Sequence, residues 1–342
     1  MKKIVILSAF LSPLRSGAEA CAEEVPLALE GQYDFTIITA RMRKGLPKKD
    51  KLQGKIPVIR VGFGCTFDKW LFPFLAPLAT RKLKPDVIHA VLETYAGLAL
   101  VFCKAPKKIL TCQTTNRSLL KGLIVRSADQ VTCISRALAE IIQGLGCNSV
   151  LLISNGIHAA ELADAGLNEE RIPGSVLFVG RLEKMKGIDT LLQAVAKVPG
   201  VTLDIVGDGS QKELLQNLTT DLGITDRVQF LGYLPPESLA KHYARAQVFC
   251  GLSRSEALGN VFLEAQAAGC AVIGTSVGGI PDILDHEKTG LIVAPDNADA
   301  AAQAINRIME DTDLRNRIQE ASAARAQAFD WSVIAAQYAK LY

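Results

Sequence analysis

The sequence of 342 residues contains no apolar run long enough to cross a bilayer, no tandem repeat and no low-complexity tract. It also lacks a Walker A loop and a G-x-G-x-x-G motif after the first expected strand, which argues against an NTPase and against a dehydrogenase. The four histidines and eight cysteines do not have the spacing of metal ligands. Several cysteines lie in apolar runs, which indicates buried thiols in a reducing cytosol: Cys103, Cys112, Cys133, Cys250 and Cys270.

The net charge of +3 is small, but it conceals two halves of opposite sign. Residues 1–160 contain 22 Lys and Arg against 11 Asp and Glu, whereas residues 161–342 contain 16 against 24. A basic first half predicts an anionic partner there, namely a membrane surface, a phosphorylated lipid or an acidic glycan. No nucleic-acid recognition motif accompanies this charge, so we expect no nucleic acid partner.

Short apolar runs alternate with amphipathic stretches through both halves of the chain, which is typical of βα units and a parallel sheet. The pattern predicts an α/β protein with two Rossmann-like, doubly wound domains that face each other across a cleft, with the ligand at the carboxyl ends of the strands. We place the seam between the domains in the polar stretch 155–174. The expected strands are residues 3–10, 34–40, 57–62, 86–91, 107–113, 130–135, 149–154, 175–182, 201–206, 227–231, 248–252, 271–275 and 290–294.

The first apolar segment allows a second interpretation. Residues 1–11, with A-E-A-C further along the chain, also resemble a short signal peptide. We prefer a buried strand that runs into a loop, because Glu19 lies at the centre of the supposed cleavage site.

The run S-R-S-E-A-L-G-N-V-F-L-E, from Ser253 to Glu264, is the most informative feature. It predicts a loop followed by a helix over residues 260–268, with Gly269 as the stop before a buried strand. The N-terminus of such a helix favours a phosphate through its free N–H groups and its dipole. The carboxylates of Glu256 and Glu264 would accept hydrogen bonds from sugar hydroxyls. A phosphate next to polyols is what a nucleotide sugar presents.

The segment G-R-L-E-K-M-K-G, residues 180–187, follows another expected strand. Arg181 offers a planar fork for phosphate and Lys186 a point charge, so together they would stabilise a diphosphate leaving group without a metal. The alternative is two surface cations in a βα loop. The presence of Glu256 and Glu264 in the same domain favours the functional interpretation.

Other candidate positions carry weaker signals. In Ser16–Gly17–Ala18–Glu19 the glycine would let the backbone approach a phosphate, and Gly207 closes a later strand in the same way. The Gly278–Gly279 pair predicts a tight turn, with Pro281 at the start of a helix. The two glycines would either leave room for a ligand or serve only the turn. The one D-x-D sequence, residues 311–313, falls between helix patterns and predicts a helix cap rather than a metal site. His89 ends a strand, where it would face the cleft or sit in the core.

Residues 41–84 join a basic stretch to an aromatic one that contains Phe63, Phe67, Trp70, Phe72 and Phe74. This order is compatible with peripheral contact with an anionic membrane. We prefer a solvated loop followed by a helix that faces the core.

These motifs resemble the retaining glycosyltransferases of family four, also called glycosyl transferase group 1, which have the GT-B fold. The resemblance runs through almost the whole chain and is most specific in G-R-L-x-x-x-K-G, V-G-D-G, F-L-G, E-x7-E and the G-G turn. It implies an acceptor domain over residues 1–160, a donor domain over residues 161–325 and a C-terminal helix over residues 326–342 that crosses back to the first domain. The segments S-N-G-I at 154–157 and F-D-W-S at 329–332 match the family at these crossings.

The resemblance also implies roles for individual residues in a metal-independent transfer from a nucleotide-diphosphate sugar, with no further cofactor. Arg181 and Lys186 would hold the diphosphate, and Glu264 the ribose. Glu256 would contact the donor sugar, and the departing phosphate would itself take the acceptor proton. The backbone near the donor would be supplied by Gly17, Gly207, Leu258, Gly259, Asn260 and Val261.

The acceptor side departs from the family. The family often has a second histidine where Val91 stands, and a histidine where Gln113 stands, so His89 and Gln113 are the remaining acceptor-side candidates. We expect the acceptor to be a glycan or a lipid-linked molecule, and the basic first half would suit an anionic one. We expect a cytoplasmic enzyme that can associate peripherally with the inner face of the cell membrane. The alternatives are a non-catalytic nucleotide-sugar-binding scaffold with a degenerate acceptor site, and a sugar-nucleotide epimerase of the same fold.

Overall fold

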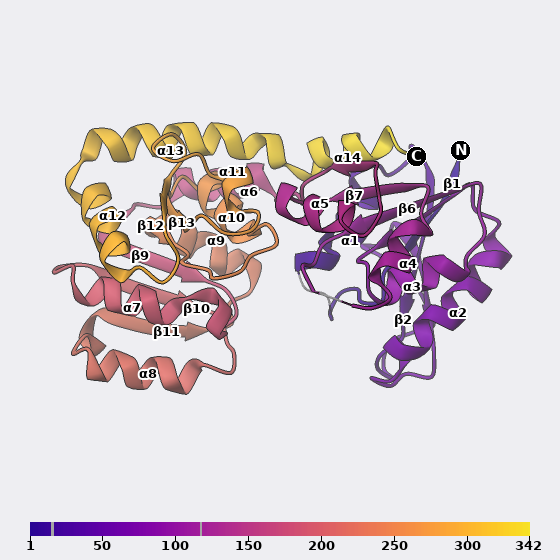
Figure 1. Cartoon of the computed structure of the whole chain (residues 1–342), viewed down its shortest axis with the longest axis horizontal. Coiled ribbons are helices and arrows are strands. Elements are labelled where there is room, and N and C mark those ends of the chain that lie inside the picture. Colours follow the sequence, from indigo (N-terminus) through magenta and orange to yellow (C-terminus); the bar gives the residue numbers. More distant parts are fainter. Residues whose placement is uncertain (15–16, 117) are drawn as a thin grey trace. The chain divides into compact units, whose positions relative to one another are not determined.

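The structure of the chain is a computed structural model that describes residues 1–14, 17–116 and 118–342. It divides into two compact units, each with its own sheet (Figure 1). Unit 1 comprises Met1–Gly156 together with Trp331–Tyr342, and unit 2 comprises Ile157–Asp330. The expected α/β class, with two Rossmann-like doubly wound domains, is confirmed.

The unit 1 sheet has eight strands in the order β3-β4-β2-β1-β5-β6-β7-β8, and every pair except β3–β4 is parallel. The chain builds outward from β1 on one side and then continues from β5 on the other, so the topological switch point lies between β1 and β5. The strands are β1 (Lys3–Leu7), β2 (Asp34–Ala40), β3 (Lys49–Leu52), β4 (Ile56–Val61), β5 (Val87–Val91), β6 (Lys107–Cys112), β7 (Gln130–Cys133) and β8 (Val150–Leu152).

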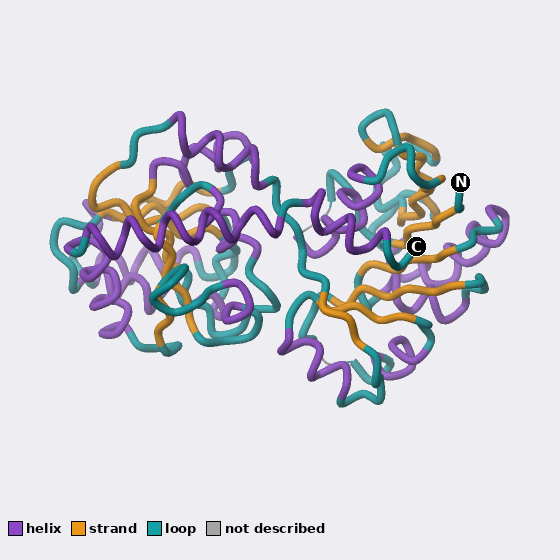
Figure 2. Tube along the Cα trace, turned by 90° about the horizontal axis from the view of Figure 1, so that it is seen from above, coloured by secondary structure: helices purple, strands orange, loops and turns teal. Residues whose placement is uncertain are grey.

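Helices flank the unit 1 sheet (Figure 2). Successive residues of β1 point to opposite faces of the sheet, and all of them after Lys3 are buried, as expected for a parallel sheet covered on both faces. Ile4 and Ile6 pack in one core with α1 and with Trp331 and Tyr338 of α14, so the last helix of the chain belongs to the first unit. The helices are η1 (Gly17–Glu19), α1 (Ala20–Ala28), α2 (Asp68–Leu83), α3 (Tyr95–Phe102), α4 (Lys121–Arg126), α5 (Arg136–Gln143) and α14 (Trp331–Ala339).

The unit 2 sheet has six parallel strands in the order β11-β10-β9-β12-β13-β14. The strands that follow β9 first extend the sheet on one side and then on the other, which places the switch point between β9 and β12. The strands are β9 (Ile172–Val179), β10 (Thr202–Val206), β11 (Val228–Gly232), β12 (Ala246–Cys250), β13 (Ala271–Thr275) and β14 (Leu291–Val293).

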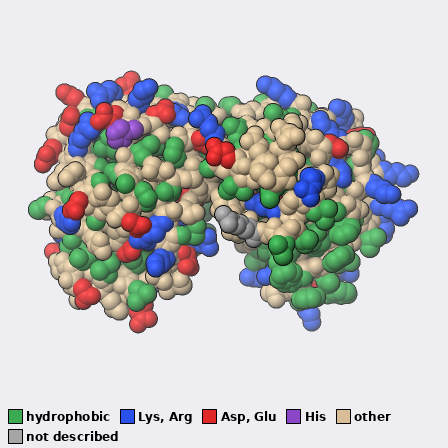
Figure 3. Space-filling model, in the orientation of Figure 1, with side chains coloured by type: hydrophobic (Ala, Val, Ile, Leu, Met, Phe, Trp, Pro, Cys, Tyr) green, Lys and Arg blue, Asp and Glu red, His purple; other side chains and the backbone are tan. Residues whose placement is uncertain are grey.

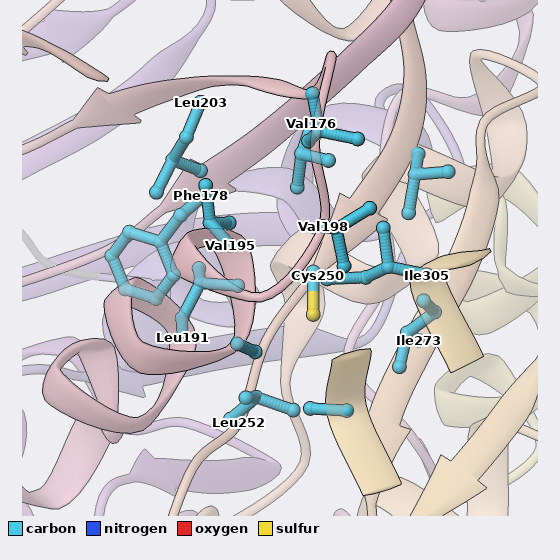
Figure 4. Packing of buried hydrophobic residues seen from close by; sticks show 14 of the residues in the cluster. Val176, Phe178, Leu191, Val195, Val198, Leu203, Cys250, Leu252, Ile273 and Ile305 are labelled. Atoms are coloured by element: carbon cyan, nitrogen blue, oxygen red, sulfur yellow. The ribbon is translucent and has the colours of Figure 1, made fainter. Parts of the chain in front are cut away.

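The core of unit 2 lies between this sheet and the helices that return along it. Figure 4 shows Val176 and Phe178 of β9 in one cluster with Leu191 and Val195 of α7 and Ile305 of α12. The helices are α6 (Ala159–Asn168), η2 (Lys184–Lys186), α7 (Ile188–Ala196), α8 (Lys212–Asp221), η3 (Thr225–Arg227), α9 (Pro236–Arg245), α10 (Asn260–Ala267), α11 (Ile280–Ile283), α12 (Ala298–Glu310), α13 (Thr312–Ala326) and η4 (Gln327–Phe329).

All thirteen expected strands are present, with ends displaced by at most three residues. The first of them is β1, so the strand interpretation of that segment is confirmed. The pattern missed β3, an antiparallel edge strand whose side chains are mostly exposed and charged. An edge strand without a buried face leaves no apolar alternation to detect. The expected helix cap at Asp311 is confirmed, since its carboxylate accepts from the Leu314 N–H at 2.8 Å.

The preferred interpretation of residues 41–84 was wrong in one respect. Helix α2 covers β2 and β4, as expected, but several of its aromatic side chains face solvent. Among the described residues, no helix combines the length and the apolar character needed to cross a membrane.

Candidate active site in unit 2

The predicted donor residues of unit 2 gather at one edge of its sheet. Arg181 and Lys186 follow β9, Gly207 follows β10, Glu256 follows β12 and the Gly278–Gly279 turn follows β13. These four strands are neighbours and parallel, so their carboxyl ends lie side by side at the switch point. This is the edge where open α/β sheets bind ligands.

Two of the predicted residues are in direct contact. The Lys186 Nζ donates to the Glu256 Oε2 at 2.5 Å, and the Ser253 Oγ donates to the same carboxylate oxygen at 3.3 Å. Both charged side chains are partly buried, at 16% and 14% exposed. Arg181, five residues before Lys186 in the same loop, is exposed, and its backbone carbonyl accepts from the Glu183 N–H at 2.9 Å. Its guanidinium makes no hydrogen bond or salt bridge with the described residues, although its charge helps to lower the pKa of Glu183. A guanidinium in that state is available for an incoming anion.

Arg254 joins the loop after β12 to the loop that carries Lys186. Its backbone N–H donates to the Met185 carbonyl at 2.8 Å, and its guanidinium donates to the Lys184 carbonyl and to Asp189. A further hydrogen bond reaches Asp296 at 2.5 Å. The sequence analysis quoted Arg254 within its motif but gave it no role. The structure shows that it holds η2 and the start of α7 against the loop that carries Glu256.

Glycines allow the same loops to meet backbone to backbone. Gly187 has φ +64°, and a Cβ there would lie 2.0 Å from the Leu252 carbonyl oxygen. Gly278 has φ +55°, and a Cβ there would lie 1.7 Å from the Glu256 carbonyl oxygen, to which the Gly279 N–H donates at 3.2 Å. The G-G turn therefore supports the backbone of Glu256.

Gly207 serves a similar contact between the loops after β9 and β10. A Cβ at Gly207 would lie 1.9 Å from the Gly180 carbonyl oxygen, and the Leu182 N–H donates to the Asp208 carbonyl at 2.9 Å. The space in front of Gly207 is thus taken by the backbone that leads to Arg181. Its predicted contact with the donor stays a prediction, and the structure gives it a packing role.

Helix α10 begins at the predicted place, with Gly259 as its N-cap at φ +98°. No side chain caps this end. Leu258 is buried, whereas Asn260 and Val261 are partly exposed at the first helical turn. Free N–H groups and the helix dipole make such an end favourable for a phosphate.

Glu264 lies one turn further along α10 and is held by a residue that the sequence did not point to. The buried Tyr243 of α9 donates its hydroxyl to the Glu264 Oε2 at 2.8 Å. Burial raises the pKa of the Glu264 carboxyl, although the hydrogen bond from Tyr243 and the charge of His158 oppose this rise. Tyr243 precedes Glu264 by 21 residues in another helix, so no local motif joins them.

The predicted residues of unit 1 lie in a different setting. Gly17 begins η1 after β1 and is exposed, while its neighbour Ser16 lies outside the described residues. His89 is fully buried, with Nδ1 2.8 Å from the Tyr342 hydroxyl and Nε2 2.7 Å from the Thr111 hydroxyl. Burial lowers the pKa of His89 to about 3, which keeps the ring neutral. Its acceptor role stays a prediction that this burial does not favour.

Gln113 belongs to a buried polar cluster at the carboxyl edge of the unit 1 sheet. Its N–H donates to the Glu93 Oε2 at 2.8 Å, and its side-chain oxygen accepts from the Asn155 Nδ2 at 2.8 Å. Glu93 also pairs with the Lys121 Nζ at 2.9 Å, with both side chains almost fully buried. The Gln113 Nε2 and the Asn155 Oδ1 have no hydrogen-bond partner among the described residues. No sequence motif indicated Glu93 or Lys121, and Asn155 was noted only as part of the S-N-G-I segment, with no role in a site.

The eight cysteines are free, and those expected to be buried are buried. Within residues 1–14, 17–116 and 118–342, no group of three or more His, Cys, Asp and Glu side chains is arranged to hold a metal ion.

Comparison with known proteins assigns the family. The sequence model described as "Glycosyl transferases group 1" matches residues 164–325, and "Glycosyltransferase Family 4" matches residues 15–161. The lipopolysaccharide core biosynthesis glycosyltransferase LpsE of Rhizobium meliloti is 30% identical over 287 residues, which cover 82% of this chain and 83% of that protein. This chain is a group 1 glycosyltransferase of the family 4 type.

Solved structures agree on the fold of this glycosyltransferase. Sucrose-phosphate synthase of Thermosynechococcus elongatus has a TM-score of 0.87 at 24% identity and covers 100% of this chain and 98% of its own. HepE of Anabaena, in complex with UDP-glucose, has a TM-score of 0.79 at 23% identity, and the match covers 100% of this chain and 99% of HepE. At these identities the likeness shows the GT-B fold of the enzyme and not its substrates.

Proposed function

We propose that this enzyme transfers a sugar from a nucleoside-diphosphate sugar to a glycan or lipid-linked acceptor, with retention of the anomeric configuration and without a metal ion. The contact of Lys186 with Glu256 carries the proposal, because it joins a cation for phosphate and a carboxylate for hydroxyls at the switch point. The free guanidinium of Arg181 lies in the same loop as Lys186. HepE, which was solved with UDP-glucose, makes a UDP-sugar the first donor to test.

In the proposed reaction, the bond between C1 of the donor sugar and the β-phosphate oxygen breaks. The acceptor hydroxyl oxygen bonds to C1 on the same face, and its proton passes to the departing phosphate oxygen. Arg181, Lys186 and the first amides of α10 stabilise the negative charge that develops on this phosphate. Glu256 binds hydroxyls of the donor sugar, and Glu264 binds those of the ribose.

On the acceptor side, we propose that hydroxyls are bound at the carboxyl edge of the unit 1 sheet near Gln113. The support is the buried Gln113 Nε2 and Asn155 Oδ1, which lack partners among the described residues and so have hydrogen-bonding capacity to offer. Lys121 and Glu93 fix the surrounding loops. A cytoplasmic location is part of the same proposal, and the free, mostly buried cysteines are compatible with a reducing compartment.

The stereochemical test uses water as a slow acceptor. The enzyme is incubated with UDP-α-glucose and the anomer of the released glucose is followed by proton NMR before mutarotation. We expect the α anomer first, and an undiminished rate in excess EDTA because two cations stabilise the diphosphate. Initial release of the β anomer would contradict retention, and loss of turnover in EDTA would contradict metal independence. A parallel run with GDP- and ADP-sugars identifies the base.

A further inference from the structure

Helix α2 of unit 1 presents an apolar stripe to solvent. Its exposed members recur every three or four residues from the N-cap onward, namely Phe67, Trp70, Phe74 and Leu78. Residues at that spacing lie on one face of a helix. The eleven steps along the helix from the first to the last make the stripe about 16 Å long.

The opposite side of the same helix is buried. Phe72, Ala76 and Thr80 are buried, and α2 packs on β2 and β4 of the unit 1 sheet. One apolar side is enough to hold a surface helix on its sheet. The exposed stripe is therefore not needed to hold α2 on the sheet, and although Trp70 and Phe74 contact rings of α3, more than half of each side chain stays in solvent.

Neighbouring side chains extend the stripe into a patch. Phe63, before the helix, and Phe102, at the end of α3, are exposed as well, so that six large apolar side chains keep between 53% and 74% of their surface in solvent. The rings of Phe74 and Phe102 lie 5.7 Å apart, and those of Trp70 and Tyr95 lie 5.1 Å apart. Figure 3 shows hydrophobic side chains gathered in this region of unit 1. We name it the α2 patch: Phe63, Phe67, Trp70, Phe74, Leu78 and Phe102.

The chain around the α2 patch is strongly basic. Residues 41–84 contain twelve Lys and Arg and only two Asp and Glu. Neither acid projects a free negative charge, since Asp50 pairs with Arg60 at 3.3 Å and Asp68 is fully buried. Asp68 instead accepts from the N–H groups of Phe63 and Gly64, at 3.0 Å and 2.7 Å, and so shapes the start of the helix.

Exposed cations lie at both ends of the stripe. Arg81, Lys82 and Lys84 are exposed at the C-terminal end of α2, and Lys104 is exposed just after Phe102. At the other end, the backbone of Lys44 lies against Gly64, so that the basic loop adjoins the N-terminus of the helix.

We propose that the α2 patch docks this enzyme on the surface of a membrane that contains anionic lipid. Aromatic side chains flanked by Lys and Arg suit the boundary between headgroups and acyl chains. The missing negative charge suits anionic lipid, and it disfavours pairing of this surface with the same surface of a second copy, because unit 1 carries 23 Lys and Arg against 11 Asp and Glu. The docking stands independently of the transfer reaction proposed above.

The chain contains its own reporter for this docking. Of the two tryptophans, Trp70 is 56% exposed in the patch, whereas Trp331 is 6% exposed in the core. The full-length protein is titrated with vesicles of phosphatidylcholine, with and without phosphatidylglycerol, while tryptophan emission and co-sedimentation are measured. We expect a blue shift and sedimentation with the anionic vesicles only, weakened by salt. Trp70→Phe should abolish the shift and preserve sedimentation.

Two variants test the residues. Phe74→Glu with Leu78→Glu should weaken sedimentation with anionic vesicles at least about ten-fold, because two side chains lose their apolar contact. Arg81→Gln with Lys82→Gln should weaken it about five-fold for each charge removed. The matched control, Leu167→Glu with Leu214→Glu, changes two similarly exposed leucines in unit 2 and should bind as wild type.

Three results would overturn the proposal. They are no binding of the wild type to anionic vesicles, equal binding to vesicles of pure phosphatidylcholine, and equal binding by wild type and the Phe74/Leu78 variant. Self-association in solution that this variant abolishes, without any vesicle binding, would assign the patch to a second copy and also refute membrane docking. Circular dichroism and UDP-sugar binding of each variant check that its fold is intact.

Discussion

The turn at Gly278 offers a direct test of how the site is positioned. The backbone there has φ +55°, and a Cβ would lie 1.7 Å from the Glu256 carbonyl oxygen. Real Cβ contacts do not fall below 3.0 Å, so Gly278→Ala must displace one of the two backbones by about 1.3 Å. Because the neighbouring N–H of Gly279 donates to the same carbonyl, the displacement would pass to Glu256 and to its contact with Lys186.

The size of the effect follows from two contributions. An alanine at positive φ costs about 1–2 kcal/mol, and a forced shift in a packed region adds about 1–3 kcal/mol. We therefore expect Gly278→Ala to lower the free energy of unfolding by about 2–5 kcal/mol. A displacement of about 1 Å in a positioned catalytic group lowers kcat/KM by about a hundred-fold.

Gly223→Ala is the matched control. Gly223 has φ +66°, close to that of Gly278, but a Cβ there would meet no atom within 4 Å. It should lose only the backbone contribution of about 1–2 kcal/mol and keep its kcat/KM. Chemical denaturation and steady-state release of nucleoside diphosphate measure the two quantities. Equal losses of stability in both variants, with unchanged kcat/KM in Gly278→Ala, would refute this account of the turn.

Two further predictions follow from pKa shifts. Burial raises the folded-state pKa of Glu264, so the contribution of this carboxyl to stability is lost as the pH rises through that pKa. Above that pH, Glu264→Gln should melt at a higher temperature than the wild type. A UDP-sugar should raise the melting temperature of the variant less than that of the wild type. A lower melting temperature of the free variant would contradict this. Burial lowers the pKa of His89 from 6.5 to about 3, so the unfolded state takes up a proton first as the pH is lowered. The free energy of unfolding should therefore fall as the pH drops from 6.5 to about 3, by up to about 1.4 kcal/mol per pH unit. His89→Gln should remove this slope in acid denaturation, and an unchanged slope would exclude His89 as its source.

The strands and the donor loops were predictable because their signals are local. Strands of a covered parallel sheet are apolar runs, and the residues that follow them must gather at the carboxyl edge. Such a run precedes Arg181, Lys186 and Glu256, so their positions in the sequence predict that they lie at one edge of the sheet. Glu264 followed from its position in the predicted helix.

The residues that were missed act through contacts between distant segments. Arg254 reaches Asp189 across 65 positions, and Lys121 pairs with Glu93 from another βα loop. Charge and residue type alone do not select such partners from the other acids and bases of the chain. His89 shows the converse, since its place at a strand end was predicted, whereas its burial depends on Tyr342 at the far end of the sequence.

The orientation of α2 was also hidden from the sequence. Apolar residues occur on both sides of this helix, so the hydrophobic pattern does not say which side meets the sheet. The preference for a core-facing helix held for Phe72 and failed for Phe74, two residues later and on the opposite side.

The central claim, a nucleotide-sugar site built on Lys186 and Glu256, is tested most directly by calorimetric binding of UDP-, GDP- and ADP-sugars. Lys186→Ala is compared with Lys184→Ala, which removes an exposed lysine from the same short helix η2. Loss of a charge-assisted contact predicts about ten- to hundred-fold weaker binding of one nucleotide family in Lys186→Ala, and unchanged binding in Lys184→Ala. Equal affinities in both variants, or no binding of any nucleotide sugar by the wild type, would contradict the account.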